Sequence, residues 1–365
     1  MTQILHDPET HAMLALEFTP GLGPVRIKTL LEHFSDAQTV LETKLMKLRD
    51  VPGLDSKSIA GIGSSQSLDR ATTELERAAK LEVQVIASSS PNYPAALKAI
   101  YDPPPVLWVR GDVVALEQLE GVTPRAIGIV GTRKCSPHAR AFTAKLAREL
   151  AQSGITVISG LARGIDTEAH RSSVEAGGKS IAVLGSGVDH IYPSENTSLA
   201  ASLTLVSAYP IGTRPAAHNF PDRNRIIAGL SSGTIVIEGD LDSGSLITAV
   251  AALEAGRTVF AVPGRPGESN AKGPNRLIKE GAVLIESASD VLEEMRWGSG
   301  ARTSEVMPAL EGHEARVYAA LDDILLVDDI VIRTGLAVYE AQSILMMLKL
   351  KGVILELPGG RYSRL

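Results

Sequence analysis

Glycines, hydroxyl residues and arginines recur directly after apolar, β-branched runs in a pattern suited to phosphate. Gly131-Thr132-Arg133 follows the run at 127–130. Three further loops of this kind supply Ser159, Gly160, Arg163 and Gly164; Gly185, Ser186 and Gly187; and Ser243, Gly244 and Ser245. Backbone amides at helix N-termini, hydroxyls and guanidinium groups are what proteins use to bind phosphate. The sequence therefore predicts several anion-binding corners.

A further segment, FPDRNRIIAGLSSGTIVIEG at 220–239, places polar residues just before a buried run. Phe220, Arg223, Asn224 and Arg225 precede the apolar residues 234–238. Arginine is seldom buried unless it is paired, so these side chains should face a carboxylate, a phosphate or water. Salt bridges to acidic residues such as Asp166, Asp189 or Glu238 are the alternative to phosphate binding.

Strand-like and helix-like segments alternate through the middle of the chain. The expected strands are 127–131, 156–160, 180–185, 205–209, 234–238, 258–262 and 282–286, and the expected helices are 137–153, 166–176, 245–255 and 273–279. This alternation predicts an α/β fold with a doubly wound parallel sheet. Because the carboxyl ends of parallel strands line the ligand crevice, the glycine- and serine-rich loops should share one edge.

Other chemistries fit less well. The dinucleotide fingerprint G-x-G-x-x-G is missing. Ser159, Ser186, Ser243 and Ser245 lie in expected loops, where serine commonly forms turns and helix caps rather than acting in hydrolysis. Asp166 and His170 are four residues apart and could bind a metal or act as an acid–base pair. The favoured alternative is that Asp166 caps its own helix and pairs with His170. Cys135 lies beside Arg133 and Lys134, yet no histidine is near it in sequence, so we interpret it as incidental.

Composition narrows the class of protein. The 365 residues carry 36 basic and 42 acidic side chains, a net charge of −6, so an anion site must be local. A single cysteine excludes a disulfide framework. The N-terminus has no long apolar stretch, so we expect a cytoplasmic protein without a membrane segment.

The first 80 residues are expected to form a separate helical module. PGLGPVRIKTLLEHF from Pro20 and PGLDSKSIAGI from Pro52 resemble helix-hairpin-helix motifs, in which Arg26, Lys28 and Lys57 could approach phosphates. A helical packing module that does not bind DNA is the alternative, and the 9 basic against 11 acidic residues favour it.

The remaining boundaries follow from composition. Residues 81–296 form the expected sheet domain, and the polar stretch 297–307 is typical of a linker. Residues 308–365 indicate three helices and a hairpin about a Pro-Gly-Gly turn, a winged-helix-like pattern. These residues include 8 acidic and 6 basic side chains, and the third helix carries Glu340 and Met346-Met347. This composition favours a region that docks on a partner or on a second copy over one that recognises DNA sequence in the major groove.

Taken in order, the loop motifs resemble the DNA-processing protein A (DprA/Smf) family. They are YDPPPVLWVRGD (101–112), IGIVGTR (127–133), VISGLARGIDTEAH (157–170), AVLGSGVDHIYP (182–193), FPDRNRIIAGL (220–230), SGSLITA (243–249) and VFAVPG (259–264). The resemblance spans about residues 90–290. It implies an extended Rossmann-like domain that needs no cofactor, binds single-stranded DNA, forms a homodimer and loads the RecA recombinase in natural transformation.

The resemblance also implies roles for individual residues. The loop residues named above would bind DNA, with Phe220 as a face for a base, and no residue would be catalytic. Leu277, Ile278 and Leu284 would lie in the dimer interface, although ordinary core packing explains them equally well. Lysines that many family members carry near the Tyr-Pro turn or before the FPxRNR segment are missing from YPSEN and PAAHNF.

Two rival functions stay open on the sequence alone. A nucleotide-cleaving phosphoribohydrolase shares this fold class, but SGSLITAVAALE (243–254) lacks the Pro-Gly pair of that family's Pro-Gly-Gly-x-Gly-Thr-x-x-Glu corner and has no glutamate at the spacing of that motif. A purely structural adaptor would have all of its loop arginines paired internally.

Overall fold

The computed structural model describes residues 7–119, 121, 123–297, 310, 312–321, 325–350, 353–357 and 361–364. Contacts between residues divide the chain into two compact units, Met1–Gly300 and Ala301–Leu365, and each is described by itself. The helical module and the sheet domain expected from the sequence both lie within the first unit.

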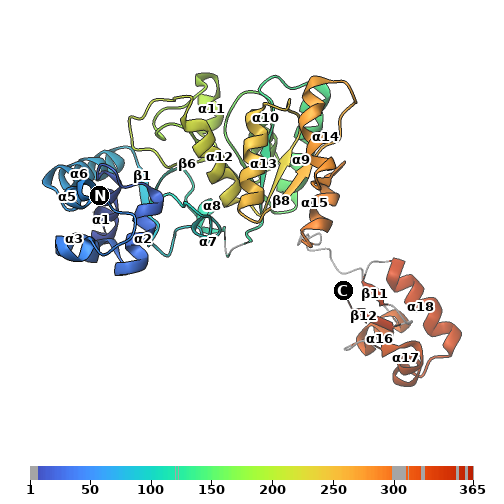
Figure 1. Cartoon of the computed structure of the whole chain (residues 1–365). Helices are drawn as coiled ribbons and strands as arrows, with labels where there is room; N and C mark the ends of the chain where they lie inside the picture. Colours follow the sequence, from blue (N-terminus) through green and yellow to red (C-terminus); the bar gives the residue numbers. More distant parts are fainter. Residues whose placement is uncertain are drawn as a thin grey trace. The chain divides into compact units, whose positions relative to one another are not determined.

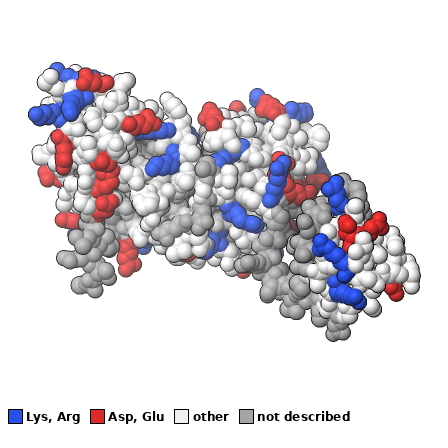
Figure 2. Space-filling view, turned by 90° about the horizontal axis from the view of Figure 1, so that it is seen from below, with Lys and Arg blue, Asp and Glu red and all other residues white. Residues whose placement is uncertain are grey.

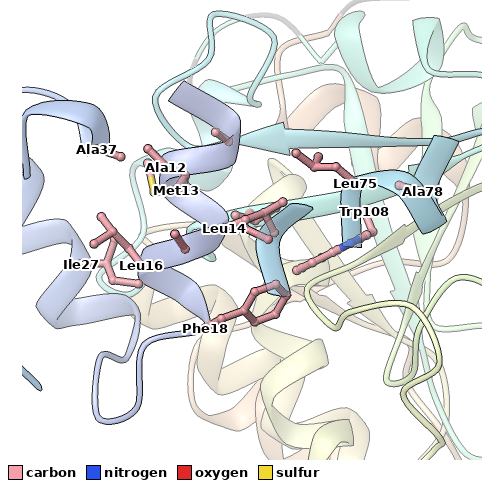
Figure 3. Close-up of a cluster of buried hydrophobic side chains, with 14 of the residues drawn as sticks. Ala12, Met13, Leu14, Leu16, Phe18, Ile27, Ala37, Leu75, Ala78 and Trp108 are labelled. Carbon is pink, nitrogen blue, oxygen red and sulfur yellow. The ribbon is translucent and has the colours of Figure 1, made fainter. Parts of the chain in front are cut away.

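The first unit begins with six helices, as expected for residues 1–80. They are α1 (Pro8–Glu17), α2 (Pro24–Phe34), α3 (Ala37–Glu42), α4 (Leu45–Leu48), α5 (Ser56–Gly61) and α6 (Ser65–Lys80). Their apolar faces share one core with the sheet. In Figure 3, Leu14 of α1 and Leu75 of α6 lie near Trp108 of strand β2, and all three are buried. The division at residue 80 stays a prediction.

The two Pro-Gly-Leu turns of this region are held by internal bonds. Gly21 and Gly53 have φ values of 85° and 82°, which explains the glycine at each turn. Arg26 donates to the Gly21 carbonyl and to the Asp55 carboxylate, each at 2.8 Å. Lys28 donates at 3.3 Å to two carbonyls of the segment that leads into β2. These bonds favour the packing module over a helix-hairpin-helix that binds DNA.

A nine-stranded sheet forms the centre of the first unit (Figure 1). Its order is β1-β2-β6-β5-β4-β3-β7-β8-β9. The strands are β1 (Val83–Ala87), β2 (Val106–Arg110), β3 (Ala126–Val130), β4 (Thr156–Ser159), β5 (Ser180–Leu184), β6 (Thr204–Ser207), β7 (Gly233–Val236), β8 (Thr258–Ala261) and β9 (Val283–Leu284). The seven strands from β6 to β9 in this order are parallel, which confirms the predicted fold class.

The sequence analysis missed the antiparallel edge of this sheet. Strand β2 pairs antiparallel with both β1 and β6. Both β1 and β2 are five residues long and lie near prolines and short turns. Their alternation of apolar and polar side chains is therefore too short to distinguish them from loop segments in the sequence. Expected strand 282–286 proved to be only two residues, Val283–Leu284.

Helices cover both faces of the parallel sheet. Side chains of α9 (Pro137–Gln152), α10 (Ile165–Glu175) and α15 (Ala288–Glu294) join one core cluster with Ile127, Ile129 and Val157. Those of α12 (Asn219–Leu230), α13 (Gly244–Glu254) and α14 (Lys272–Lys279) pack against the other face. The remaining short helices are α7 (Ala95–Lys98), α8 (Val114–Glu117), η1 (Ser194–Asn196), α11 (Thr197–Ala200) and η2 (Ser269–Ala271).

The helices after β3 and β7 lie on opposite faces of the sheet, although the two strands are neighbours. Helix α9 follows β3 and α13 follows β7. The order of the strands therefore reverses between β3 and β7, and a crevice opens at their carboxyl ends. This is where doubly wound folds bind their ligands.

The second unit has the winged-helix pattern that was predicted. Its elements are α16 (Gly312–Ala320), β10 (Leu325–Leu326), α17 (Val327–Thr334), α18 (Val338–Leu350), β11 (Ile354–Leu357) and β12 (Arg361–Arg364). The three strands form one antiparallel sheet, in which β10 was not anticipated. The Pro-Gly-Gly turn and the expected linker beyond residue 297 lie outside the described residues. Glu340 and Met346-Met347 lie on α18, with both methionines exposed.

Candidate nucleic-acid interface

A pocket of about 510 Å³ opens at the carboxyl ends of β3 and β7. Nine residues predicted to bind DNA line it: Gly131, Thr132, Arg133, Phe220, Arg223, Asn224, Ser243, Gly244 and Ser245. We call this the switch-point pocket. Chain segments distant in sequence thus meet there, as expected for loops that share the edge where parallel strands end.

Arg133 and Lys134 are the exposed cations of this pocket. The Arg133 guanidinium lies 5.2 Å from the centroid of the Phe220 ring. Within the described part of the chain, no carboxylate lies within ion-pair distance of either side chain. Both charges are therefore available to a ligand.

The loop after β3 approaches its neighbours closely. A Cβ on Gly131 would lie 2.6 Å from Ile165 Cγ1, so only glycine fits. The Thr132 amide donates to the Glu238 carbonyl at 2.7 Å. The Glu238 carboxylate accepts from the amide and the hydroxyl of Ser136, the N-cap of α9. Gly131–Arg133 therefore precedes the N-terminus of α9, where Ser136 and the Glu238 carboxylate occupy the capping position.

Arg223 lies on a helix that the sequence analysis did not anticipate. Residues 219–230 form α12, which places Arg223 under the rim, only 4% exposed. Its guanidinium lies against Gly160, where a Cβ would come within 1.6 Å of Nη1, and Nη1 donates to the Val183 carbonyl at 2.9 Å. Burial lowers the Arg223 pKa, the Asp166 carboxylate opposes this shift, and Arg133 adds to it. Arg223 Nε is buried without a hydrogen-bond partner among the described residues.

Asp166 and His170 hold the loop that follows β4. Asp166 Oδ2 accepts from the amides of Gly160 and Ala162, at 3.2 and 3.4 Å. The Leu161 amide donates to His170 Nε2 at 3.3 Å. Burial, with the nearby Arg223 charge, lowers the His170 pKa to about 3, so the ring is neutral. These bonds favour the structural interpretation of Asp166 and His170. No group of three metal-binding side chains occurs among the described residues.

The Phe220 side chain packs against the backbone that follows β5. A Cβ on Gly185 would lie 3.1 Å from Phe220 Cδ1, so the ring rests on the glycine backbone. The Asn219 amide group donates to the Gly185 carbonyl at 2.9 Å. Asn224, one turn along α12, donates to the Gly244 carbonyl at 3.1 Å and links α12 to the start of α13. The aromatic face at the pocket is therefore fixed by backbone contacts.

Eight of the predicted residues do not line the switch-point pocket: Ser159, Gly160, Arg163, Gly164, Gly185, Ser186, Gly187 and Arg225. Ser159 and Ser186 donate their hydroxyls to the carbonyls of Ile129 and His190. The glycines allow close packing: Gly160 under Arg223, Gly185 under Phe220, Gly164 against Thr132 and Gly187 against Pro210.

The two other loop arginines form ion pairs. Arg163 makes two bonds to Glu195, at 2.7 and 2.8 Å. Arg225 pairs with Asp102 and with Asp222, because it faces away from Arg223 around α12. Both guanidinium groups are therefore paired within the protein, and the expected DNA contacts of Arg163 and Arg225 stay predictions. Spacing along the sequence did not reveal these partners.

The pocket also contains residues that the sequence analysis missed. Besides Val130, Ala162 and Thr248, they are Lys134, Asp240, Asp242 and Asn270. Lys134 follows Arg133 directly and could have been included on charge alone. Asn270 comes from η2, distant in sequence, and donates to the Lys134 carbonyl at 3.2 Å, which no local pattern indicates.

The expected dimer residues differ in exposure. Leu277 is 5% exposed and belongs to the protomer's own core, which favours ordinary core packing over a dimer interface for this residue. Ile278 packs against the same core and is partly buried. Leu284 is 45% exposed on the edge strand β9. Helix α13 exposes Ile247, Val250 and Leu253, a spacing that places them on one helical face.

Comparison with known proteins settles the family. The family model described as DNA recombination-mediator protein A matches residues 84–296, and the DprA winged helix domain matches residues 302–360. The chain belongs to the DprA/Smf family. It is 34% identical over 390 residues to Protein Smf of Synechocystis sp., covering 96% of this chain and 98% of that protein.

Two solved structures of the family also resemble this one. The structure of DNA processing protein A from Streptococcus pneumoniae is 33% identical, with a TM-score of 0.66, and the match covers 78% of this chain and 97% of that one. The Helicobacter pylori protein is 29% identical, with a TM-score of 0.52, covering 60% and 97%. The Helicobacter pylori structure is described as giving insight into a unique single-stranded DNA binding mode of that protein.

Proposed function

We propose that this DprA/Smf family member binds single-stranded DNA in the switch-point pocket, protects it, and loads RecA onto it during natural transformation. The observation that carries the proposal is the free charge of Arg133 and Lys134 beside the seated Phe220 ring. A cation beside an aromatic face suits one phosphate and one unstacked base.

The surface charge supports a local site over a general affinity for nucleic acid. Figure 2 shows Lys and Arg dispersed among Asp and Glu over the face in view. The net charge of −6 makes long-range attraction to DNA weak. Binding should therefore depend on short-range contacts that require a flexible strand, and single strands should bind better than duplex.

A salt-series titration tests this proposal. Labelled single-stranded and duplex oligonucleotides of one sequence are titrated with protein at several salt concentrations, and affinity is measured by anisotropy. We expect a preference for the single strand at each concentration. Equal affinity for the two forms at moderate salt would contradict the proposal.

RecA loading has its own experiment. The family model describes a recombination mediator, which supports this part of the proposal. RecA assembly is followed on oligonucleotides already coated with single-strand-binding protein, with and without this chain. The proposal expects a shorter lag before RecA assembles, and an unchanged lag would exclude loading.

We infer that the chain is not an enzyme, although a phosphoribohydrolase-like activity stays the alternative. Of the acidic side chains near the pocket, Asp166, Glu238 and Asp240 accept hydrogen bonds from protein groups. Incubation with nucleoside monophosphates, followed by chromatography of released base, distinguishes the two functions. Release of base above the buffer control would support the enzyme.

The homodimer and the cytoplasmic location belong to the same proposal. Leu284 and the exposed face of α13 provide apolar surface for a second copy. Sedimentation at micromolar concentration should show a dimer, and a monomer throughout would contradict it. No single described helix is long and apolar enough to cross a membrane; α17 and part of α18 pass that test only as a pair bent by 109°.

A further inference from the structure

A separate cavity of about 280 Å³ lies in the first unit, between helix α2 and the segment that joins β1 to β2. The helix residues that line it recur at the spacing of one helical face, and the other wall follows β1 and precedes β2. We call this the α2 cavity. None of its residues lines the switch-point pocket. Its walls include Ile27, Lys28, Leu31, Ser89, Lys98 and Pro105.

Part of the α2 cavity is apolar. Ile27 and Leu31 line it from the helix, and the buried Pro103 and Pro105 line it from the other wall. Proline has no backbone N–H, so these two residues present no donor that a ligand would have to satisfy. Clefts that hold drug-sized ligands have volumes of roughly 300–1,000 Å³. The α2 cavity is smaller than these, so it suits a single apolar side chain.

The same cavity contains a hydroxyl that lacks a bonding partner. Ser89 lines the α2 cavity, and its Oγ is buried without a hydrogen-bond partner among the described residues. A buried hydroxyl in this state destabilises the fold, and buried polar groups in proteins are almost always paired. An oxygen atom of a ligand in the cavity would accept the hydrogen bond that Ser89 can donate.

The charges around the cavity favour a ligand with one negative charge. Lys98 is exposed, with no carboxylate within ion-pair distance in the described part of the chain. Lys28 donates to the carbonyls of Ile100 and Tyr101 at 3.3 Å, and its ammonium has a third proton to donate. Glu32 also lines the cavity, so the net charge of the lining is +1. A ligand with many negative charges, such as a nucleic-acid backbone, would meet the Glu32 carboxylate.

We propose that the α2 cavity binds the carboxyl-terminal residue of a partner polypeptide that ends in an apolar side chain. The side chain fills the apolar part, and the α-carboxylate accepts hydrogen bonds from Lys98 and Ser89. A terminal residue has both groups on one carbon atom, so a cavity of this size can take them together. The α-ammonium of a free amino acid would lie as close to the two lysines as its carboxylate, which disfavours that ligand. This site goes beyond the proposed binding of DNA and does not depend on it.

Three short peptides test the chemistry of the cavity. Each carries fluorescein at its N-terminus: Gly-Gly-Phe with a free carboxylate, Gly-Gly-Phe with a C-terminal amide, and Gly-Gly-Gly with a free carboxylate. Full-length protein is titrated into each, and affinity is measured by anisotropy. We expect the Gly-Gly-Phe acid to bind roughly 10-fold or more tightly than either of the others. The amide loses the charge-assisted hydrogen bonds, and Gly-Gly-Gly loses the buried side chain.

Two variants place the peptide in this cavity. Lys98→Ala should weaken binding of the Gly-Gly-Phe acid roughly 10-fold and leave binding of the amide unchanged. Ser89→Ala should also weaken binding of the acid, without a lower midpoint of unfolding in urea, because its Oγ has no partner to lose. Lys80→Ala is the matched control, since Lys80 is exposed at the end of α6, does not line the cavity and makes the same change in charge. It should bind like the parent.

The possible results either support or overturn the inference. It is overturned if the Gly-Gly-Phe acid does not bind, if the amide or Gly-Gly-Gly binds as tightly, or if Lys98→Ala binds the acid like the parent. Displacement by free phenylalanine as effective as that by unlabelled Gly-Gly-Phe would show an amino-acid site and overturn it too. If Lys98→Ala is misfolded by circular dichroism, weaker binding by Ser89→Ala supports the inference and unchanged binding overturns it. A parent that binds the peptide but no single-stranded DNA would contradict the proposed function alone.

Discussion

Replacing Arg133 with alanine is the most direct test of the switch-point pocket. The side chain is exposed, has no carboxylate within ion-pair distance among the described residues, and covers the Phe220 ring at 5.2 Å. Its removal should therefore leave the fold intact. A charge-assisted hydrogen bond contributes about 1.5–3 kcal/mol, and loss of about 2 kcal/mol corresponds to roughly 30-fold in affinity.

The salt dependence gives a second readout of the same variant. For a single strand, removing the cation from one phosphate reduces the slope of log affinity against log salt by about 0.7. Anisotropy titrations of the parent and Arg133→Ala across a salt series measure both quantities. Arg133→Lys should retain the slope while binding less tightly, because lysine keeps the charge but not the planar guanidinium.

Arg148→Ala is the matched control for this experiment. Arg148 is exposed on the C-terminal half of α9, away from the carboxyl ends of the strands, and its loss makes the same change in net charge. It should bind like the parent. If Arg133→Ala also binds like the parent with an unchanged slope, the pocket is not the phosphate site and the reasoning fails at its strongest residue.

The paired and buried groups give three further predictions. Arg223→Ala should lower the free energy of unfolding in urea by about 3 kcal/mol, because it leaves Asp166 buried without its nearby cation; unchanged stability would show that Arg223 is not structural. Glu195→Gln should free Arg163 and strengthen single-strand binding about two- to fivefold by titration, whereas weaker or equal binding would remove Arg163 from the DNA path. Burial raises the Glu17 pKa to about 7 from an ordinary 4.5, so the folded state retains this proton and stability should be lost as pH rises through that window. Glu17→Gln should therefore be more stable than the parent at pH 8 by about 1–3 kcal/mol but not at pH 4, and equal stability at both would contradict the shift.

The parallel sheet could be predicted because its strands carry their own signal. Strands buried on both faces need apolar, β-branched residues along their whole length, and the chain must turn sharply after each one. The runs ending at Val130, Ser159 and Val236 could therefore be recognised as strands from the sequence. The antiparallel strands β1 and β2 were missed because they are short and lie beside turns, where the alternation of side chains is too brief to recognise.

The candidate site also contains residues that could be predicted from the sequence and residues that could not. Sequence alone placed Arg133 at this edge, because a parallel fold brings residues that follow strands to one edge. Phe220 lies on α12 and does not follow a strand, and it was the family resemblance that indicated it as a face for a base. The sequence did not separate Arg223 from Arg225, which lie two residues apart. Helix α12 directs the first under Gly160 and the second toward Asp102, so one lines the pocket and the other is paired outside it.

The sequence by itself thus determined the fold class, the family resemblance and the edge of the sheet where a ligand would bind, since these depend on local composition and the order of segments along the chain. Only the tertiary structure decided which charges stay free. Glu195 and Asp102 come from segments distant in sequence, yet each pairs with an arginine that the loop sequences offer to phosphate. Pairing of charges depends on distances in space, and spacing along the chain does not contain those distances.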